Sequence, residues 1–128
     1  MTINRRNVQA HDVEFEILYC GICHSDLHQI KDDFGGTMWP IVPDHELLGK
    51  VTAIGHHVKN YKVGDLVGVG CIAGSCGQTQ EMLDFCFKHN ITADSEIINI
   101  QDVNTAFDRL EKGDIKYRFV IDMASLES

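Results

Sequence analysis

The chain has 128 residues, which is enough for one domain but not for two full enzyme domains. Its 19 acidic and 11 basic residues give a formal net charge of -8, which argues against a nucleic-acid-binding protein. No apolar run approaches the roughly 20 residues of a membrane span. The residues after Met1 are polar rather than those of a secretory signal, and the chain has five cysteines. We therefore expect a cytoplasmic domain whose cysteines are free thiols or metal ligands.

The first half of the chain is predicted to be rich in β-structure. Apolar and polar residues alternate over 13–19, the period of a half-buried strand. We expect Gly21 to change the chain direction directly after this strand, and a short helical turn to follow over 24–31. A second strand is predicted over 47–54, and a hairpin centred on a Gly-Asp dipeptide over 61–69.

The second half mixes helices with short strands. A helix is predicted over 78–89, and Asn90 is a residue that can end it in the left-handed conformation. Asp102 is expected to cap an amphipathic helix over 103–110, whose apolar residues recur at helical spacing. Short strands are expected over 96–100 and 117–121.

Two short segments carry most of the chemical signal. The first begins with Cys20 and Cys23 in a Cys-x-x-Cys pattern, and the second contains His45 about 20 residues later. A thiolate and an imidazole are suitable zinc ligands, and Asp26 and Glu46 could orient them. The Cys-x-x-Cys pattern alone also fits a redox pair, half of a zinc ribbon, or two unrelated thiols.

A glycine-rich segment over 68–73 fits the G-x-G-x-x-A pattern of a dinucleotide-binding turn. A true site needs these glycines to open a helix within a βαβ unit. Here the pattern ends several residues before the predicted helix, and no parallel strand pair is evident. These two points argue against a dinucleotide-binding turn in this segment.

Several segments resemble one enzyme family, in the family's own order. They are similar to the zinc-dependent medium-chain alcohol dehydrogenases, specifically the cinnamyl alcohol dehydrogenase branch. The matching segments are residues 19–29, 40–49, 64–70, 79–86 and 116–122.

The resemblance implies a catalytic zinc ion held by Cys23 and His45, with Glu46 as a neighbouring carboxylate that can approach the metal. In this family the zinc ion assists hydride transfer between a small alcohol or aldehyde and NADP. The implied cofactors are therefore zinc and NADP, and the implied substrate is a small alcohol or aldehyde.

The resemblance also assigns roles around the metal. Ser25 would receive the proton of the substrate hydroxyl, with Asp26 and His28 beside it in the relay. His24 and Arg118 match positions near the phosphates of the cofactor. Because the domain that binds the cofactor is absent, we expect Arg118, in a strand, to make a surface ion pair rather than to bind the cofactor.

Departures from the family pattern limit this expectation. The third cysteine ligand, the structural-zinc lobe and most of the nucleotide-binding domain have no counterpart, so we infer a large internal deletion joining near 71–76. Asp44 replaces the glycine that usually precedes the zinc histidine, and we expect it to place an extra carboxylate beside the metal.

The expected fold is mainly β, in the α+β class: a GroES-like, partly open β-barrel with short helices and without a Rossmann domain. Residues 1–72 and 91–128 would together form this catalytic domain, and 73–90 would be a remnant helix of the deleted nucleotide-binding domain.

We expect a shortened alcohol dehydrogenase homologue with little or no activity alone. The alternatives are a zinc-binding or protein-interaction domain, which could self-associate through the apolar helix 78–89, or a subunit that needs a separate nucleotide-binding chain.

Overall fold

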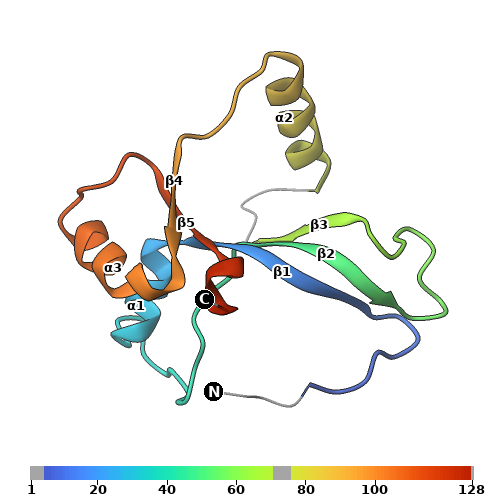
Figure 1. Cartoon of the computed structure of the whole chain (residues 1–128), viewed down its shortest axis with the longest axis horizontal. Coiled ribbons are helices and arrows are strands. Elements are labelled where there is room, and N and C mark those ends of the chain that lie inside the picture. Colours follow the sequence, from blue (N-terminus) through green and yellow to red (C-terminus); the bar gives the residue numbers. More distant parts are fainter. Residues whose placement is uncertain (1–4, 71–75, 128) are drawn as a thin grey trace.

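The computed structural model describes residues 5–70 and 76–127, and the strands in this part form one sheet in the order β3-β2-β1-β5-β4 (Figure 1). Neighbouring strands are antiparallel except for β4 and β5, which are parallel. The strands are β1 (Val13–Ile22), β2 (Leu47–Ile54), β3 (Leu66–Val69), β4 (Ser95–Asn99) and β5 (Arg118–Asp122). The helices are α1 (His24–Ile30), α2 (Cys76–Lys88) and α3 (Val103–Glu111), with 3-10 turns η1 (Ile100–Asp102) and η2 (Met123–Glu127). The predicted fold class is confirmed.

Strand β1 is longer than predicted and joins the two halves of the chain. It pairs with β2 along most of its length and with β5 from Tyr19 to Ile22. Gly21 continues the strand, so the predicted change of direction there is wrong. A Cβ atom at this position would lie 2.4 Å from Oε2 of Glu46, so the strand needs a glycine for close packing rather than for a turn. A bulge between Ile17 and Tyr19 interrupts the predicted alternation of apolar residues.

The predicted hairpin over 61–69 is only half correct, because β3 is its sole strand. The backbone N–H of Lys62 donates to the Asp65 carboxylate at 3.0 Å, which closes a turn where the first strand was expected. The backbone of Val51 in β2 then bonds to Gly64 and Asp65 at 2.9 Å each, which docks this turn on the sheet.

The core lies between α3 and the sheet. Phe119 on β5 is fully buried, and it packs in one cluster with Ala106 and Leu110 of α3. Helix α3 thus has the buried stripe that its apolar spacing predicts. Asp102 stands at the N-cap but makes no side-chain capping bond, contrary to the prediction. The turn η1 leads directly into α3, and the amide of Val103 donates to the carbonyl of Ile100 instead.

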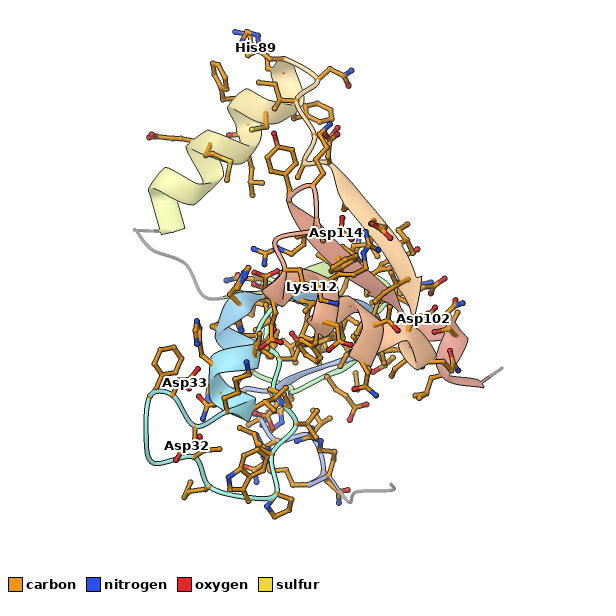
Figure 2. All side chains as sticks on the ribbon, turned by 90° about the vertical axis from the view of Figure 1, so that its left-hand side faces the viewer. Asp32, Asp33, His89, Asp102, Lys112 and Asp114 are labelled. Carbon is orange, nitrogen blue, oxygen red and sulfur yellow. The ribbon has the colours of Figure 1, made fainter. Side chains whose placement is uncertain are left out.

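Helix α2 stands apart from the sheet (Figures 1 and 2). It ends near Asn90, which adopts the predicted left-handed conformation with φ of 53°. Its apolar side chains Met82, Leu83, Phe85 and Phe87 are all exposed, Phe87 to 90%. The large apolar side chains of this helix thus lie uncovered by the rest of the described chain. Among the described helices, none is both long and apolar enough to cross a membrane.

Candidate metal centre

Three potential metal ligands meet where β1 ends and β2 begins. Cys23 directly follows β1, whereas His45 and Glu46 directly precede β2. The antiparallel register pairs Cys20 with Leu47 and so brings these segments together. One donor atom from each of Cys23, His45 and Glu46 lies within 4.8 Å of the other two, and this is the only such group among the described residues.

The buried carboxylate of Asp26 orients two of these ligands. One oxygen accepts a hydrogen bond from the backbone N–H of Cys23 at 2.9 Å, and the other lies 3.1 Å from Nδ1 of His45. Asp26 is only 5% exposed, so water has little access to its carboxylate and competes weakly for these two hydrogen bonds. A hydrogen bond at Nδ1 leaves Nε2 of His45 as the nitrogen available to a metal.

The surroundings of Cys23 favour its thiolate. Partial burial opposes ionisation, but hydrogen bonds from the side chain and backbone of Ser25, together with Arg118, outweigh it and lower the pKa of this thiol. A thiolate is the form of cysteine that binds metals.

The pKa of His45 is shifted upward. Desolvation lowers it, but the charge and hydrogen bond of Asp26, followed by those of Cys23, raise it by more. Because a metal binds only the neutral imidazole, protons compete with the metal at this residue.

The thiol pKa of Cys20 is shifted in the opposite direction to that of Cys23, although the two belong to one Cys-x-x-Cys segment. Burial, followed by the hydrogen bond and charge of Asp44, raises the pKa of Cys20 to about 12. Asp44 also accepts a hydrogen bond from the backbone N–H of Glu46 at 2.9 Å. Asp44 is not a member of the group of donor atoms, and its described carboxylate contacts are with Cys20 and this amide.

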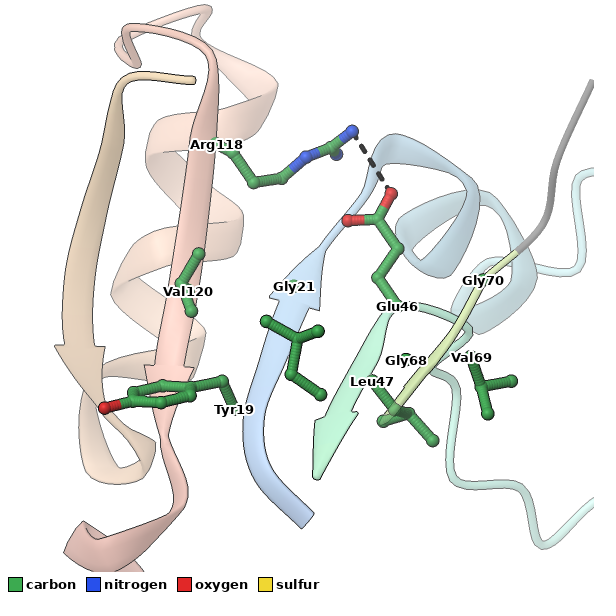
Figure 3. Close-up of a pocket in the computed structure, with 10 residues that line it drawn as sticks. Tyr19, Gly21, Glu46, Leu47, Gly68, Val69, Gly70, Arg118 and Val120 are labelled. Atoms are coloured by element: carbon green, nitrogen blue, oxygen red, sulfur yellow. Dashed lines mark ion pairs between the residues drawn. The ribbon is translucent and has the colours of Figure 1, made fainter. Parts of the chain in front are cut away.

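Arg118 connects the last strand to the ligand group. Its guanidinium lies 3.2 Å from Glu46 (Figure 3). It also donates to the carbonyl of Ile22 at 2.9 Å. Arg118 was considered for a contact with the cofactor phosphates and for an ion pair, and the structure contains the ion pair, with Glu46. Glu46 and Arg118 also line an open groove whose remaining walls are mainly apolar, with Tyr19, Leu48 and Val69 among them.

The other predicted site residues lie at different distances from this centre. The hydroxyl of Ser25 is 3.4 Å from Nε2 of His45, next to the ligands. His28 bonds to Asp33 at 2.8 Å and packs against Phe34, and neither of these contacts is with a residue of the ligand group. His24 is exposed at the start of α1.

The donor set fits a zinc ion. Sulfur, imidazole nitrogen and carboxylate oxygen are the zinc ligands found in proteins, with bonds of about 2.0–2.3 Å. Such bonds place two ligands of a tetrahedral ion about 3.3–3.8 Å apart. For one nitrogen and one oxygen ligand these bonds give a separation of about 3.3–3.5 Å. The 3.8 Å between His45 Nε2 and Glu46 Oε1 is slightly longer, so the two side chains would have to move closer together by a few tenths of an ångström to share one ion.

Residues 9–114 match the family of the alcohol dehydrogenase GroES-like domain, and the chain belongs to this family. It is 53% identical over 87 residues to vomilenine reductase from Rauvolfia serpentina, a match covering 65% of this chain and 24% of that protein. It is 60% identical over 73 residues to cinnamyl alcohol dehydrogenase 2 from the same plant, covering 57% of this chain and 20% of that protein. The matches thus span about a quarter of the length of these relatives.

A solved structure shares the fold over almost the whole chain. This structure, a cinnamyl alcohol dehydrogenase from Sorghum bicolor, has a TM-score of 0.85 and 19% sequence identity, and the match covers 95% of this chain and 93% of that one. The predicted membership of the medium-chain alcohol dehydrogenases is confirmed, and so is the GroES-like fold.

Two features of the centre were missed by the sequence analysis. One is the close approach of Gly21 to Glu46, and the other is the contact of Arg118 with Glu46 across 72 residues of sequence. Neither has a local signal, because the first depends on the pairing of β1 with β2 and the second also on the pairing of β1 with β5.

Proposed function

We propose that this chain is a shortened, zinc-binding homologue of the cinnamyl alcohol dehydrogenases, with little or no dehydrogenase activity of its own. One observation supports this most strongly: Cys23, His45 and Glu46 converge, with Asp26 holding two of them in place. Membership of the family makes zinc the expected ion.

Cys23, His45 and Glu46 would hold the zinc ion, which when bound would act as a Lewis acid toward an alcohol or aldehyde oxygen. The chain's own residues prepare this site. Ser25 lies beside His45 and could take up the proton of a substrate hydroxyl, with His28 further along α1 as a proposed member of the relay. Asp26 fixes the tautomer of His45, and Arg118 holds Glu46 to one side.

The cofactor side of the site is less complete. Arg118, one of the residues proposed for NADP phosphates, already pairs with Glu46. The described residues form one sheet, with no second, doubly wound sheet that could bind a dinucleotide. We propose that residues 1–72 and 91–128 complete one catalytic-type domain, that 73–90 is the remnant of a nucleotide-binding domain, and that turnover needs a separate chain to supply NADP. The inferred junction near 71–76 lies largely outside the described residues.

Two measurements on the purified chain test this proposal. After dialysis against a weak chelator, we expect zinc in the wild type and a clear loss of zinc in the Cys23→Ser variant, measured by mass spectrometry. Equal zinc in both would contradict the site.

We expect no NADPH-dependent reduction of aromatic aldehydes above the buffer rate, and clear turnover would contradict the inactive part of the proposal.

A second candidate function is self-association through α2, in line with the predicted homo-oligomer. The apolar side chains of this helix lie exposed, as a face that packs on another surface would. Light scattering should show an oligomer that the Phe87→Glu substitution dissociates. The Lys88→Glu variant is the matched control, because it adds the same side chain at the next exposed position. A wild-type monomer would contradict this candidate.

A further inference from the structure

A second group of imidazoles lies at the other end of the β1–β2 pair. His11 comes just before β1, and His56 and His57 come just after β2. Nδ1 of His57 is 3.1 Å from Nε2 of His11. The ring of His56 lies against that of His57, with the ring centroids 4.3 Å apart. All three side chains are exposed, so the group is open to solutes.

The backbone holds this pair of nitrogens in place. The N–H of His57 donates to the carbonyl of Ala10 at 2.8 Å, and the N–H of Gly55 donates to the carbonyl of Asp12 at 2.8 Å. A Cβ atom on Gly55 would lie 2.0 Å from the carbonyl oxygen of Gln9, so only glycine permits this approach. These bonds hold the segment before β1 against the segment after β2, and each segment carries one histidine of the pair. The backbone therefore loses little conformational entropy when the pair binds a ligand.

The separation of the nitrogens matches that of two ligands on one metal ion. With Zn–N bonds of about 2.0–2.1 Å, adjacent nitrogens are about 2.9 Å apart at a right angle and about 3.4 Å apart at a tetrahedral angle. The observed 3.1 Å lies between these values. Without a metal, the same distance fits one shared N–H···N hydrogen bond, so a metal would displace a proton from between the rings.

The charges nearby are mixed. Asp12 is bound by Arg6 and by the N–H of Gln9, and the Arg6 hydrogen bond is the main reason that its pKa is lowered to about 2. This keeps a negative charge next to His11 in the sequence. Lys59 lines the same shallow depression as His11 and His57, and it weakens the attraction for a cation.

We propose that His11 and His57 chelate a borderline divalent metal ion such as Zn²⁺, through Nε2 of His11 and Nδ1 of His57, with water completing its coordination. This site is separate from the Cys23 centre and has one protein ligand fewer. It should therefore bind zinc more weakly.

Zinc titration of the full chain in a Cys23→Ser background tests this proposal, because that background disables the first centre. Calorimetry should detect a remaining zinc site whose affinity falls at least about tenfold when His57 is changed to Gln, since even changes to residues around a ligand cost 10–100-fold. His89→Gln is the matched control, because His89 is an exposed histidine directly after α2, away from the sheet (Figure 2). Equal zinc affinity in the His57→Gln and His89→Gln variants would overturn the proposal.

Imidazole ¹⁵N resonances identify the ligand atoms directly and do not depend on a substitution. On addition of Zn²⁺ to the Cys23→Ser chain, Nε2 of His11 and Nδ1 of His57 should shift together. Shifts confined to the other nitrogens of these rings, or to His56 alone, would overturn the proposal. Failure here would leave the Cys23 centre intact, and failure of that centre would leave this pair intact.

Discussion

The candidate metal centre and helix α2 are built in opposite ways. At the centre, the ligands have partners that hold them: Asp26 bonds to Cys23 and His45, and Arg118 pairs with Glu46. On α2, the large apolar side chains lie exposed, and the sheet does not cover them. The candidate centre is thus held by contacts among its own residues, whereas α2 leaves its large apolar side chains exposed to solvent.

The largest expected effect compares two phenylalanines from these regions. Phe119 is fully buried and Phe87 is 90% exposed. Phe119→Ala should lower the free energy of unfolding by about 3–5 kcal/mol, because it leaves a cavity in the core. Phe87→Ala should change it by less than about 0.5 kcal/mol. Urea unfolding measures both, and similar losses would mean that α2 is part of the cooperative fold.

Asp26 provides the next test. Asp26→Asn should weaken zinc binding by about 10–100-fold, because it removes the negative charge that positions Cys23 and His45. Asp33→Asn is the matched control, since Asp33 also bonds to Nδ1 of a histidine, His28, but away from the centre. Competition with a zinc indicator dye measures both affinities. Equal weakening by both substitutions would argue against a positioning role for Asp26.

The two cysteines of the Cys-x-x-Cys segment should differ in reactivity. In the metal-free, reduced chain at pH 8, iodoacetamide should alkylate Cys23 at least about tenfold faster than Cys20. Hydrogen bonds from Ser25 and the charge of Arg118 lower the pKa of Cys23, whereas burial and Asp44 raise that of Cys20 to about 12. Peptide mass spectrometry over time gives both rates, and faster labelling of Cys20 would reverse the assignment of the ligand.

The smallest expected effect concerns Asp12, at the opposite end of the β1–β2 pair. Arg6 is the main cause that lowers its pKa to about 2, below an ordinary value of about 3.9. The carboxylate should therefore stabilise the fold above pH 4, and this contribution should be lost as the pH falls toward 2. Urea unfolding of Asp12→Asn should show a slight loss at pH 6 that shrinks at acidic pH. A difference that grows on acidification would contradict the ion pair.

Local patterns predicted the elements well where one face of an element is buried. Strand β2 and helix α3 follow their apolar periods, because each buries a stripe against the core. Predictions failed where a contact from elsewhere decides the structure. A turn closed by the bond from Lys62 to Asp65 takes the place of half of the predicted hairpin. Strand β1 continues through Gly21, whose backbone N–H donates to the carbonyl of Glu46, where a change of direction was expected.

The candidate centre was predictable as a set of residue types but not as an arrangement. The thiol of Cys23 and the imidazole of His45 are recognisable from the sequence, whereas the choice of Cys23 over Cys20 came from the family resemblance. In the structure the choice has a physical cause, since Cys20 is buried against Asp44 and Cys23 faces Ser25 and Arg118. The role of Arg118 needed the pairing of β1 with β5, which no local pattern encodes.

Cobalt substitution tests the central claim, that Cys23 is a ligand of a metal centre, most directly. Absorption from a thiolate-to-cobalt transition reports only a metal bound to sulfur, so the histidine pair His11 and His57 cannot contribute to it. The account predicts this absorption in the wild type and in Cys20→Ser, and its loss in Cys23→Ser. Absorption that persists in Cys23→Ser, or disappears in Cys20→Ser, would contradict the account.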